Sequence, residues 1–289
     1  MHARTVRGSV KLAASALDQG RRREACVNWS FSRWRRSRIL RRLHIDDALW
    51  RRTLDRYSFL AGLSEDERTR LHERVALFLH AKQIHGAAGL ELNEEMKLAI
   101  AVQACILTLN LPEDWYDGWV EIIVYPGKFV PQVQWQDEFG VVHEGNEVYA
   151  GEAWLQGPVI LSWADIAQSG ADGVNVVIHE FAHKIDMLDG VANGCPPLAA
   201  QMSREHWSAV FGPAYRDFCA RVDRKIPTTI DWYAAESPAE FFAVMSEAFF
   251  EVPETVREPY PEVYEQLVAF YRQDPYARHV AAGFLQPSS

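Results

Sequence analysis

The chain has 289 residues, of which 48% are hydrophobic, so it can bury the core of one large domain or of two small ones. Its net charge of −9 is unevenly distributed, because residues 1–52 contain 14 Lys and Arg against 4 Asp and Glu, which leaves the rest strongly acidic. An acidic body argues against extensive, sequence-independent binding of nucleic acid, so we expect no direct nucleic-acid partner and favour short peptides or a specific protein partner.

The cysteines and the apolar segments indicate the compartment. Cys26, Cys105, Cys195 and Cys219 lie far apart and form no C-x-x-C pair, which argues against a disulfide framework and a zinc ribbon. Cys105 lies in an apolar run that is typical of a core. The first 30 residues lack the apolar stretch of a signal peptide, and the chain has no uncharged apolar run of about 18 residues. The sequence therefore predicts a cytoplasmic protein with no membrane contact.

Residues 1–44 differ from the rest of the chain. They contain clusters of arginine, such as Arg21-Arg22-Arg23, mixed with Ser, Ala and a few aromatic residues. We interpret this segment as a disordered basic extension, or as an upstream extension of an annotated gene start. The alternatives are a contact with an acidic surface or with nucleic acid. A packed domain is predicted over residues 45–285, followed by a tail of residues 286–289.

Helix and strand signals follow one another along this domain. Ser64 and Glu67 form a capping box before apolar residues at helical spacing, which predicts a helix over about 64–83. A second helix is predicted over about 93–109, because Pro112 follows it. Strands are predicted at 119–125 and 159–163, and further helices at 172–188, 203–222, 237–252 and 260–273. These elements indicate an α+β fold, with helices flanking a small mixed sheet.

The helix predicted over 172–188 carries a candidate metal site. His179 and His183 are four positions apart, so both rings project from one face and can bind one zinc ion at about 2.0–2.1 Å. Glu180 lies beside them, off the ligand axis, where it can take a proton from a water that the metal activates. The flanking residues are apolar, which is typical of a buried helix, and buried polar groups need partners. The alternative is a pair of core histidines that hydrogen-bond to their neighbours.

A catalytic zinc site needs a third protein ligand. The downstream candidates are Asp186, Asp189, His206, Glu236, Glu240 and Glu247. Glu240 lies on an apolar helix with an acidic stripe, but Ser237 and Glu240 also match a capping box, so the sequence leaves both roles open. Asp186 either orients a ligand ring or is solvated near the helix end. Glu247, two turns beyond Glu240, either supports the site or has a solvated or helix-pairing role.

Several motifs in order resemble a known family. They are Tyr125-Pro126, Trp154-Leu155-Gln156-Gly157-Pro158, His179-Glu180-Phe181-Ala182-His183-Lys184-Ile185-Asp186 and Asp231-Trp232-Tyr233-Ala234-Ala235-Glu236-Ser237-Pro238-Ala239-Glu240. Through them, residues 45–285 resemble the Mlc titration factor A family of bacterial zinc peptidases. That family is in turn similar to the catalytic domain of anthrax lethal factor, where a tyrosine precedes the glutamate ligand by seven positions, as Tyr233 precedes Glu240 here.

The resemblance implies a zinc metallopeptidase of gluzincin type with a zincin-like α+β fold, as a single domain over residues 45–285. One Zn²⁺ would be bound by His179, His183 and Glu240, with Glu180 as general base. Tyr233 would donate to the oxyanion, the alternative for it being a buried structural tyrosine. The resemblance also implies aminopeptidase-like activity on peptides and binding of a Mlc-type transcriptional repressor. Two alternatives are a regulatory protein that sequesters a repressor with little catalysis, and a zinc hydrolase of non-peptide amides.

Overall fold

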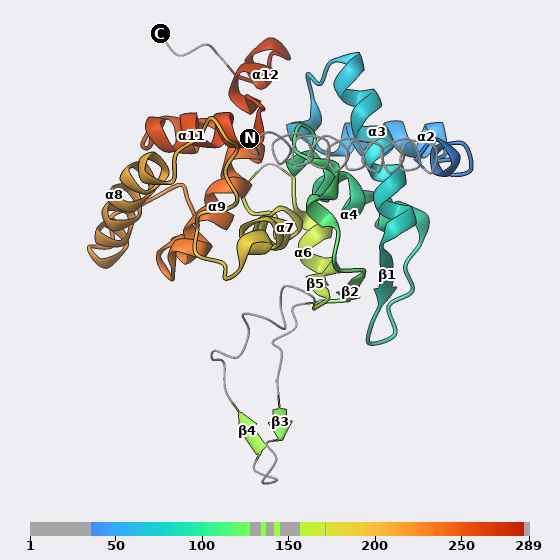
Figure 1. The fold of residues 1–289 in the computed structure, drawn as a ribbon, viewed down its shortest axis with the longest axis horizontal. Coiled ribbons are helices and arrows are strands. Elements are labelled where there is room, and N and C mark those ends of the chain that lie inside the picture. Colours follow the sequence, from blue (N-terminus) through green and yellow to red (C-terminus); the bar gives the residue numbers. More distant parts are fainter. Residues whose placement is uncertain (1–35, 128–133, 137–141, 145–156, 171, 286–289) are drawn as a thin grey trace, which may run out of the picture. The chain divides into compact units, whose positions relative to one another are not determined.

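The computed structural model describes residues 36–127, 134–136, 142–144, 157–170 and 172–285 (Figure 1). The chain divides into two units, Met1–His44 and Ile45–Ser289. In the first unit, residues 36–40 are helical. Most of the predicted basic extension and the whole tail of residues 286–289 lie outside the described residues.

The second unit consists mainly of helices. Its first half contains α2 (Asp47–Arg56), η1 (Ser58–Leu60), α3 (Glu65–Ala81), β1 (Gln83–Gly86), α4 (Glu94–Leu107), η2 (Glu113–Tyr116), β2 (Glu121–Tyr125), β3 (Gln134–Gln136), β4 (Val142–Glu144) and β5 (Val159–Ser162). Its second half contains α6 (Trp163–Gln168), α7 (Val176–Asp186), η3 (Met187–Asp189), α8 (Arg204–Asp223), η4 (Trp232–Ala235), α9 (Pro238–Glu251), α10 (Glu254–Arg257), α11 (Pro261–Tyr271) and α12 (Pro275–Ala281). The described elements are thus of α+β type, as predicted.

Within the described residues, the main sheet has three strands in the order β1-β2-β5, and both pairs are parallel (Figure 1). The mixed sheet that the sequence predicts is therefore wrong for the described residues, since the antiparallel pair β3–β4 forms a separate two-stranded sheet. A parallel pair needs a crossover connection, and α4 lies in the connection between β1 and β2. β1 has no strand signal because Gln83-Ile84-His85-Gly86 is short and mostly polar.

Helix α9 forms much of the core of the helical region. It packs against α7, α8, η4, α10, α11 and α12. Its phenylalanines at positions 241, 242, 249 and 250 are buried, and burial of one such side chain contributes about 1.5–3 kcal/mol. Glu247 and Glu251 on the same helix are also buried, so these carboxylates must find partners inside the protein.

Helix α7 lies against α4, α9 and β5, and Figure 1 shows α7 beside α9. The helix begins at Val176 rather than near residue 172, because Gly173 has a left-handed φ of 84° and the Asn175 side chain caps the helix by accepting from Ile178 N. The Phe181 ring packs edge-on against Tyr116, with centroids 5.1 Å apart. These contacts fix the orientation of the helix that carries His179, Glu180 and His183.

The other predicted helices and strands differ from the structure mainly at their ends. The capping box of Ser64 and Glu67 begins α3 as predicted, and Cys105 is buried in α4. Trp163, placed in a strand by its neighbours' β propensity, begins α6 instead, because the Ser162 hydroxyl accepts from Asp165 N and caps a helix there.

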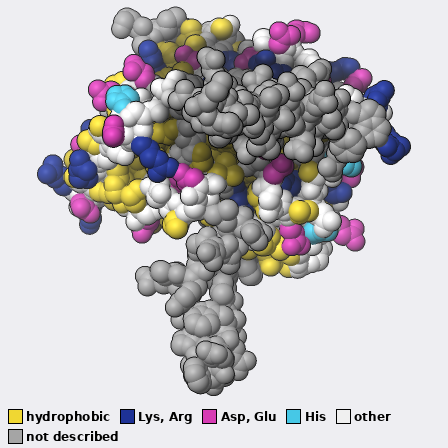
Figure 2. Space-filling model, in the orientation of Figure 1, with side chains coloured by type: hydrophobic (Ala, Val, Ile, Leu, Met, Phe, Trp, Pro, Cys, Tyr) yellow, Lys and Arg dark blue, Asp and Glu magenta, His cyan; other side chains and the backbone are white. Residues whose placement is uncertain are grey.

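Charged side chains of both signs are interspersed over the described part of the face seen in Figure 2, where Asp and Glu are magenta and Lys and Arg are dark blue. In the described ranges, no helix combines the length and the apolar character needed to cross a bilayer.

Candidate metal centre

Three side chains from α7 and α9 meet at one point. Glu240 Oε2 lies 3.0 Å from His179 Nε2 and 3.3 Å from His183 Nε2. The two Nε2 atoms are 3.1 Å apart. Among the described residues, these three form a cluster whose atoms could hold a metal ion. The structure therefore brings together the three residues that the sequence named as metal ligands.

The ends of the two helices explain why Glu240 lies there. Ser237 Oγ accepts from Glu240 N at 3.1 Å, and Pro238 occupies the first helical turn, so α9 has a well-formed start. The carboxylate of Glu240, however, points to the two histidines and not back to the Ser237 backbone. Of the two roles that the sequence left open, the structure thus favours the ligand position, with Ser237 alone capping the helix.

The separations fit the geometry of zinc. Ligand atoms at about 2.0–2.1 Å from a tetrahedral zinc ion are about 3.3 Å from one another, close to the 3.0–3.3 Å found here. The protonation of the His179 ring also suits metal binding, because Nδ1 donates to a Glu247 oxygen 2.7 Å away and so carries the hydrogen. The Nε2 lone pair of His179 would then face the Glu240 carboxylate unless a proton or a metal ion lay between them.

The pKa values of His179 and Glu240 show that a positive charge is favoured between these two side chains. Burial lowers the pKa of His179, but hydrogen bonds to Glu240 and Glu247 outweigh it and raise that pKa to about 10. Burial raises the pKa of Glu240, but hydrogen bonds to His179 and His183 outweigh it and lower that pKa to about 2. A metal ion must therefore displace a tightly held proton, and metal binding should weaken as pH falls.

Glu247 supports the metal cluster through the Nδ1 atom of His179. Its side chain is buried, one carboxylate oxygen contacts His179 Nδ1, and the other accepts from Asn175 N. The solvated role considered for Glu247 is therefore wrong. A carboxylate on the second ring nitrogen fixes the tautomer and orientation of a metal-binding histidine.

Glu180 and Tyr233 lie next to the cluster. Glu180 is half-buried on α7, and its burial raises its pKa even though His179 and His183 lower it. The Tyr233 ring lies 6.0 Å from the His179 ring, centroid to centroid, and its side chain is 43% exposed. The alternative of a buried structural tyrosine is therefore wrong, and Tyr233 is partly open to solvent beside the candidate metal ligands.

Asp186 does not have the solvated role considered for it. It is fully buried and not solvated, and its Oδ2 accepts from Asn193 N at 2.8 Å and from Gly194 N at 2.7 Å. Gly194 has a left-handed φ of 78°, and a Cβ there would lie 2.3 Å from Pro238 O. Asp186 thus ties the end of α7 to a loop that packs on the first turn of α9.

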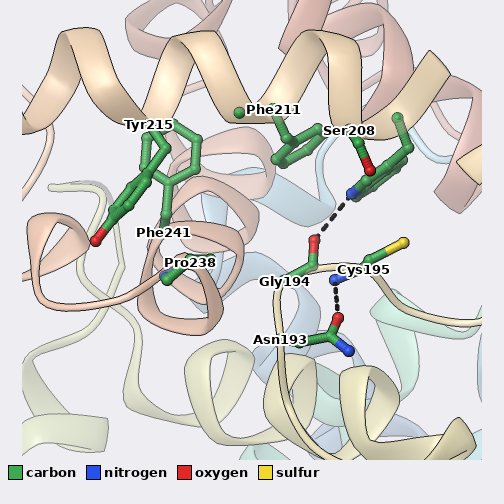
Figure 3. A pocket seen from close by; sticks show the side chains of 10 residues that line it. Asn193, Gly194, Cys195, Ser208, Phe211, Tyr215, Pro238 and Phe241 are labelled. Atoms are coloured by element: carbon green, nitrogen blue, oxygen red, sulfur yellow. Dashed lines mark hydrogen bonds between the residues drawn. The ribbon is translucent and has the colours of Figure 1, made fainter. Parts of the chain in front are cut away.

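A cavity of about 160 Å³ adjoins this loop, between α8 and the start of α9 (Figure 3). Trp207 Nε1 donates to Gly194 O across it, and Phe211, Tyr215 and Phe241 line it. None of the three candidate metal ligands lines this cavity. It is therefore separate from the metal centre, although Pro238 and Phe241 flank Glu240 in sequence.

The remaining sequence candidates for the third ligand lie outside the cluster. Asp189 forms an ion pair with Arg204. His206 lies in the first turn of α8, where its backbone N donates to Ser203 Oγ, and Glu236 is exposed at the end of η4.

Two residues near the centre were not predicted, namely Asn175 and Glu251. Asn175 Nδ2 donates to Glu251 Oε1 at 2.7 Å, across 76 positions of sequence. The available signal was the spacing of Glu240, Glu247 and Glu251, which recur along one side of α9 at helical spacing on an otherwise apolar helix.

Glu251 makes folding stability dependent on pH. Burial raises its pKa from 4.5 to about 7, with Asp172 and Glu247 adding to the effect and bonds from Asn175 and Gly173 opposing it. Between pH 4.5 and pH 7, Glu251 has lost its proton in the unfolded chain but keeps it in the folded one. The free energy of unfolding should therefore fall by about 3 kcal/mol as pH rises from 4.5 to 7. Urea unfolding with a chelator present should show this slope for the wild type and a smaller one for Glu251→Gln. Equal slopes would contradict the prediction.

Comparison with known proteins identifies the family. A model of the family described as glucose-regulated metallo-peptidase M90 matches residues 31–272. The chain belongs to this family. Mlc titration factor A of Cronobacter sakazakii is 38% identical over 222 residues, which cover 76% of this chain and 84% of that protein. Mlc titration factor A of Yersinia enterocolitica is 38% identical over 235 residues, covering 80% and 87%.

The M90 match confirms the resemblance to the Mlc titration factor A family and extends it. A protein of Synechocystis sp. described as uncharacterized is 39% identical over 226 residues, covering 76% of this chain and 82% of its own. The M90 region begins at residue 31, upstream of residue 45, where the resemblance was expected to begin. All the residues of the metal cluster, together with Glu180 and Tyr233, lie within it.

Proposed function

We propose that this M90 family member is a zinc-dependent peptidase in which His179, His183 and Glu240 hold one Zn²⁺. The observation that carries the proposal is the convergence of two imidazole nitrogens and one carboxylate oxygen at 3.0–3.3 Å in a family of metallopeptidases. When bound, zinc would lower the pKa of a water molecule to about 7 and polarise the substrate carbonyl. Two histidines and a glutamate, with Glu180 following the first histidine, define the gluzincin type of a zincin-like fold.

Glu180 is the general base in this proposal. Its position directly after His179 places a carboxylate beside the metal ligands without making it one of them. Burial raises its pKa, which makes the carboxylate a better proton acceptor near neutral pH. Glu180 would take a proton from the attacking water and return it to the leaving amine.

Tyr233 is the proposed donor to the oxyanion. Its side chain is partly exposed beside His179, and partial burial raises its pKa, so it stays protonated as a donor. Tyr233→Phe should therefore lower kcat by about 100-fold or more while zinc content stays unchanged.

The matched control for Tyr233 is its exposed neighbour in η4, through Trp232→Phe, which should leave kcat unchanged. Steady-state hydrolysis of a reporter amide and elemental analysis of both variants provide the test. A Tyr233→Phe enzyme with wild-type kcat would remove this residue from the mechanism.

The substrate class follows from the family. We propose peptides as substrates, with aminopeptidase-like preference for a free amino terminus. The test compares aminoacyl reporter amides with the same compounds N-acetylated, which should be poor substrates. Equal rates on both would argue against exopeptidase action, and turnover of non-peptide amides alone would favour a different hydrolase.

A regulatory function is the second candidate. Relatives that are 38% identical are named for titration of Mlc, so a Mlc-type transcriptional repressor is the partner we propose, and the cytoplasm is the compartment that such a partner requires. If binding alone matters, a variant that keeps the metal but lacks the base should retain the regulatory effect. If peptide hydrolysis matters, that variant should lose it.

A further inference from the structure

Asn175 occupies a fully buried position at the start of α7, four residues before His179. Its side-chain oxygen accepts from Ile178 N at 3.0 Å, which caps the helix. Its amide group donates to Gln103 Oε1 at 2.8 Å and to Glu251 Oε1 at 2.7 Å. Helix capping alone uses only the oxygen, so the two donated bonds need a separate explanation.

Through its side chain and its backbone, Asn175 connects α7 to two carboxylates that lie one turn apart on α9. The Asn175 amide nitrogen binds Glu251, while the Asn175 backbone N donates to Glu247 Oε2. Glu247 Oε1 in turn contacts His179 Nδ1 at 2.7 Å. On the other side, Gln103 Nε2 donates to Tyr57 OH at 3.1 Å, so the network is anchored in the core. A continuous buried chain of hydrogen bonds therefore leads from Glu251 to His179.

We propose that the Asn175–Glu251 pair is a positioning device for the His179 ligand, and that it acts through Glu247 to set the affinity of the metal centre. The inference rests on the proposed metal site and concerns residues that do not touch the metal. Neither Asn175 nor Glu251 is a catalytic residue.

Rotation of the His179 ring must be restricted for this ligand to hold a metal. A metal requires His179 Nε2 at a fixed position with a lone pair, so Nδ1 must carry the hydrogen and the ring must not turn. Glu247 meets both needs only while its own carboxylate is held. The Asn175 backbone N holds one of its oxygens, and Asn175 can present that group only while its side chain is fixed by Glu251 and Gln103. Loss of the amide donors should therefore loosen His179 without removing any ligand.

Asn175→Asp is the decisive variant, because aspartate keeps the shape and the helix-capping oxygen but lacks both amide donors. We expect zinc affinity to fall about 10- to 100-fold, measured by competition with a chromogenic chelator on the full chain. The visible d–d absorption of the Co²⁺-loaded protein should also change, since it reports the ligand field. The matched control is Asn93→Asp, which alters the corresponding helix-capping asparagine of α4 and should change neither reading.

Exchange of the donor and the acceptor between positions 175 and 251 distinguishes the loss of this hydrogen bond from a general loss of structure. With Glu251→Gln added to Asn175→Asp, the glutamine can donate to the new carboxylate, so the contact is restored in the opposite direction. We expect the double variant to recover at least half of the lost affinity on a logarithmic scale, with the wild-type Co²⁺ spectrum. Glu251→Ala alone, which removes the oxygen that accepts from the Asn175 amide, should weaken zinc binding and tests the proposal if Asn175→Asp fails to fold.

The outcomes are distinct. Wild-type zinc affinity in folded Asn175→Asp or in folded Glu251→Ala would overturn the inference while leaving the proposed metal site intact. Weakened binding in the double variant equal to that of Asn175→Asp would also count against a specific hydrogen bond. A wild-type chain that binds no zinc would overturn both this inference and the proposed function.

Discussion

Glu180→Gln should retain one zinc per chain and lose peptide hydrolysis, with kcat reduced by about 10²- to 10⁴-fold. The amide has nearly the same shape as the carboxylate but cannot accept the proton of the attacking water. Glu180 does not belong to the cluster of His179, His183 and Glu240, so its neutralisation removes no metal ligand. Elemental analysis and steady-state kinetics with a reporter amide measure the two properties separately.

The control for this variant is Glu236→Gln, because Glu236 is an exposed carboxylate at the end of η4 near Tyr233 and should be neutral for both properties. Hydrolysis by Glu180→Gln at more than a tenth of the wild-type rate would show that another group accepts the proton. Loss of zinc from Glu180→Gln would place Glu180 among the ligands, which contradicts the geometry described here.

Glu240→Ala should lose the metal itself. Removal of this side chain leaves only the two histidines, and we expect zinc affinity to fall by about 100-fold or more, beyond the loss typical of a residue outside the ligand set. Hydrolysis should disappear together with zinc. Competition titration with a chelator gives the affinity, and the Co²⁺ spectrum shows whether the coordination changes.

The pKa of His179 in Glu240→Ala provides an independent test. The hydrogen bond that His179 donates to Glu240 is a main reason for the raised pKa of His179, so Glu240→Ala should lower that pKa, which NMR titration of the chelator-treated protein can follow. Glu236→Ala serves as the exposed control. Full zinc occupancy with wild-type affinity in Glu240→Ala would exclude Glu240 as a ligand.

The sequence predicts the parts of this site that depend on local spacing. His179 and His183 project from one helical face because four positions make about one turn, and Glu180 follows from the same motif. Glu240 is not determined by spacing alone, since Ser237 also suits a capping box, and the resemblance to a known family was needed to prefer the ligand role. The apolar character of α9 correctly indicated a buried helix.

The parts that were missed depend on long-range contacts. Asn175 looks like an ordinary helix cap in the sequence, and its bond to Glu251 joins positions 76 residues apart. Burial of Glu247 and Asp186 became clear only once the packing of α7 against its neighbours was known. The parallel order of the sheet also depends on the crossover through α4, because strand propensity does not specify the direction of pairing.

Zinc content of the purified wild-type chain, measured by elemental analysis alongside hydrolysis of aminoacyl reporter amides, tests the central claim most directly. The account predicts one zinc per chain and hydrolysis that a chelator abolishes and added zinc restores. A folded chain that binds no zinc, or that hydrolyses the amides equally well after complete removal of the metal, would contradict it.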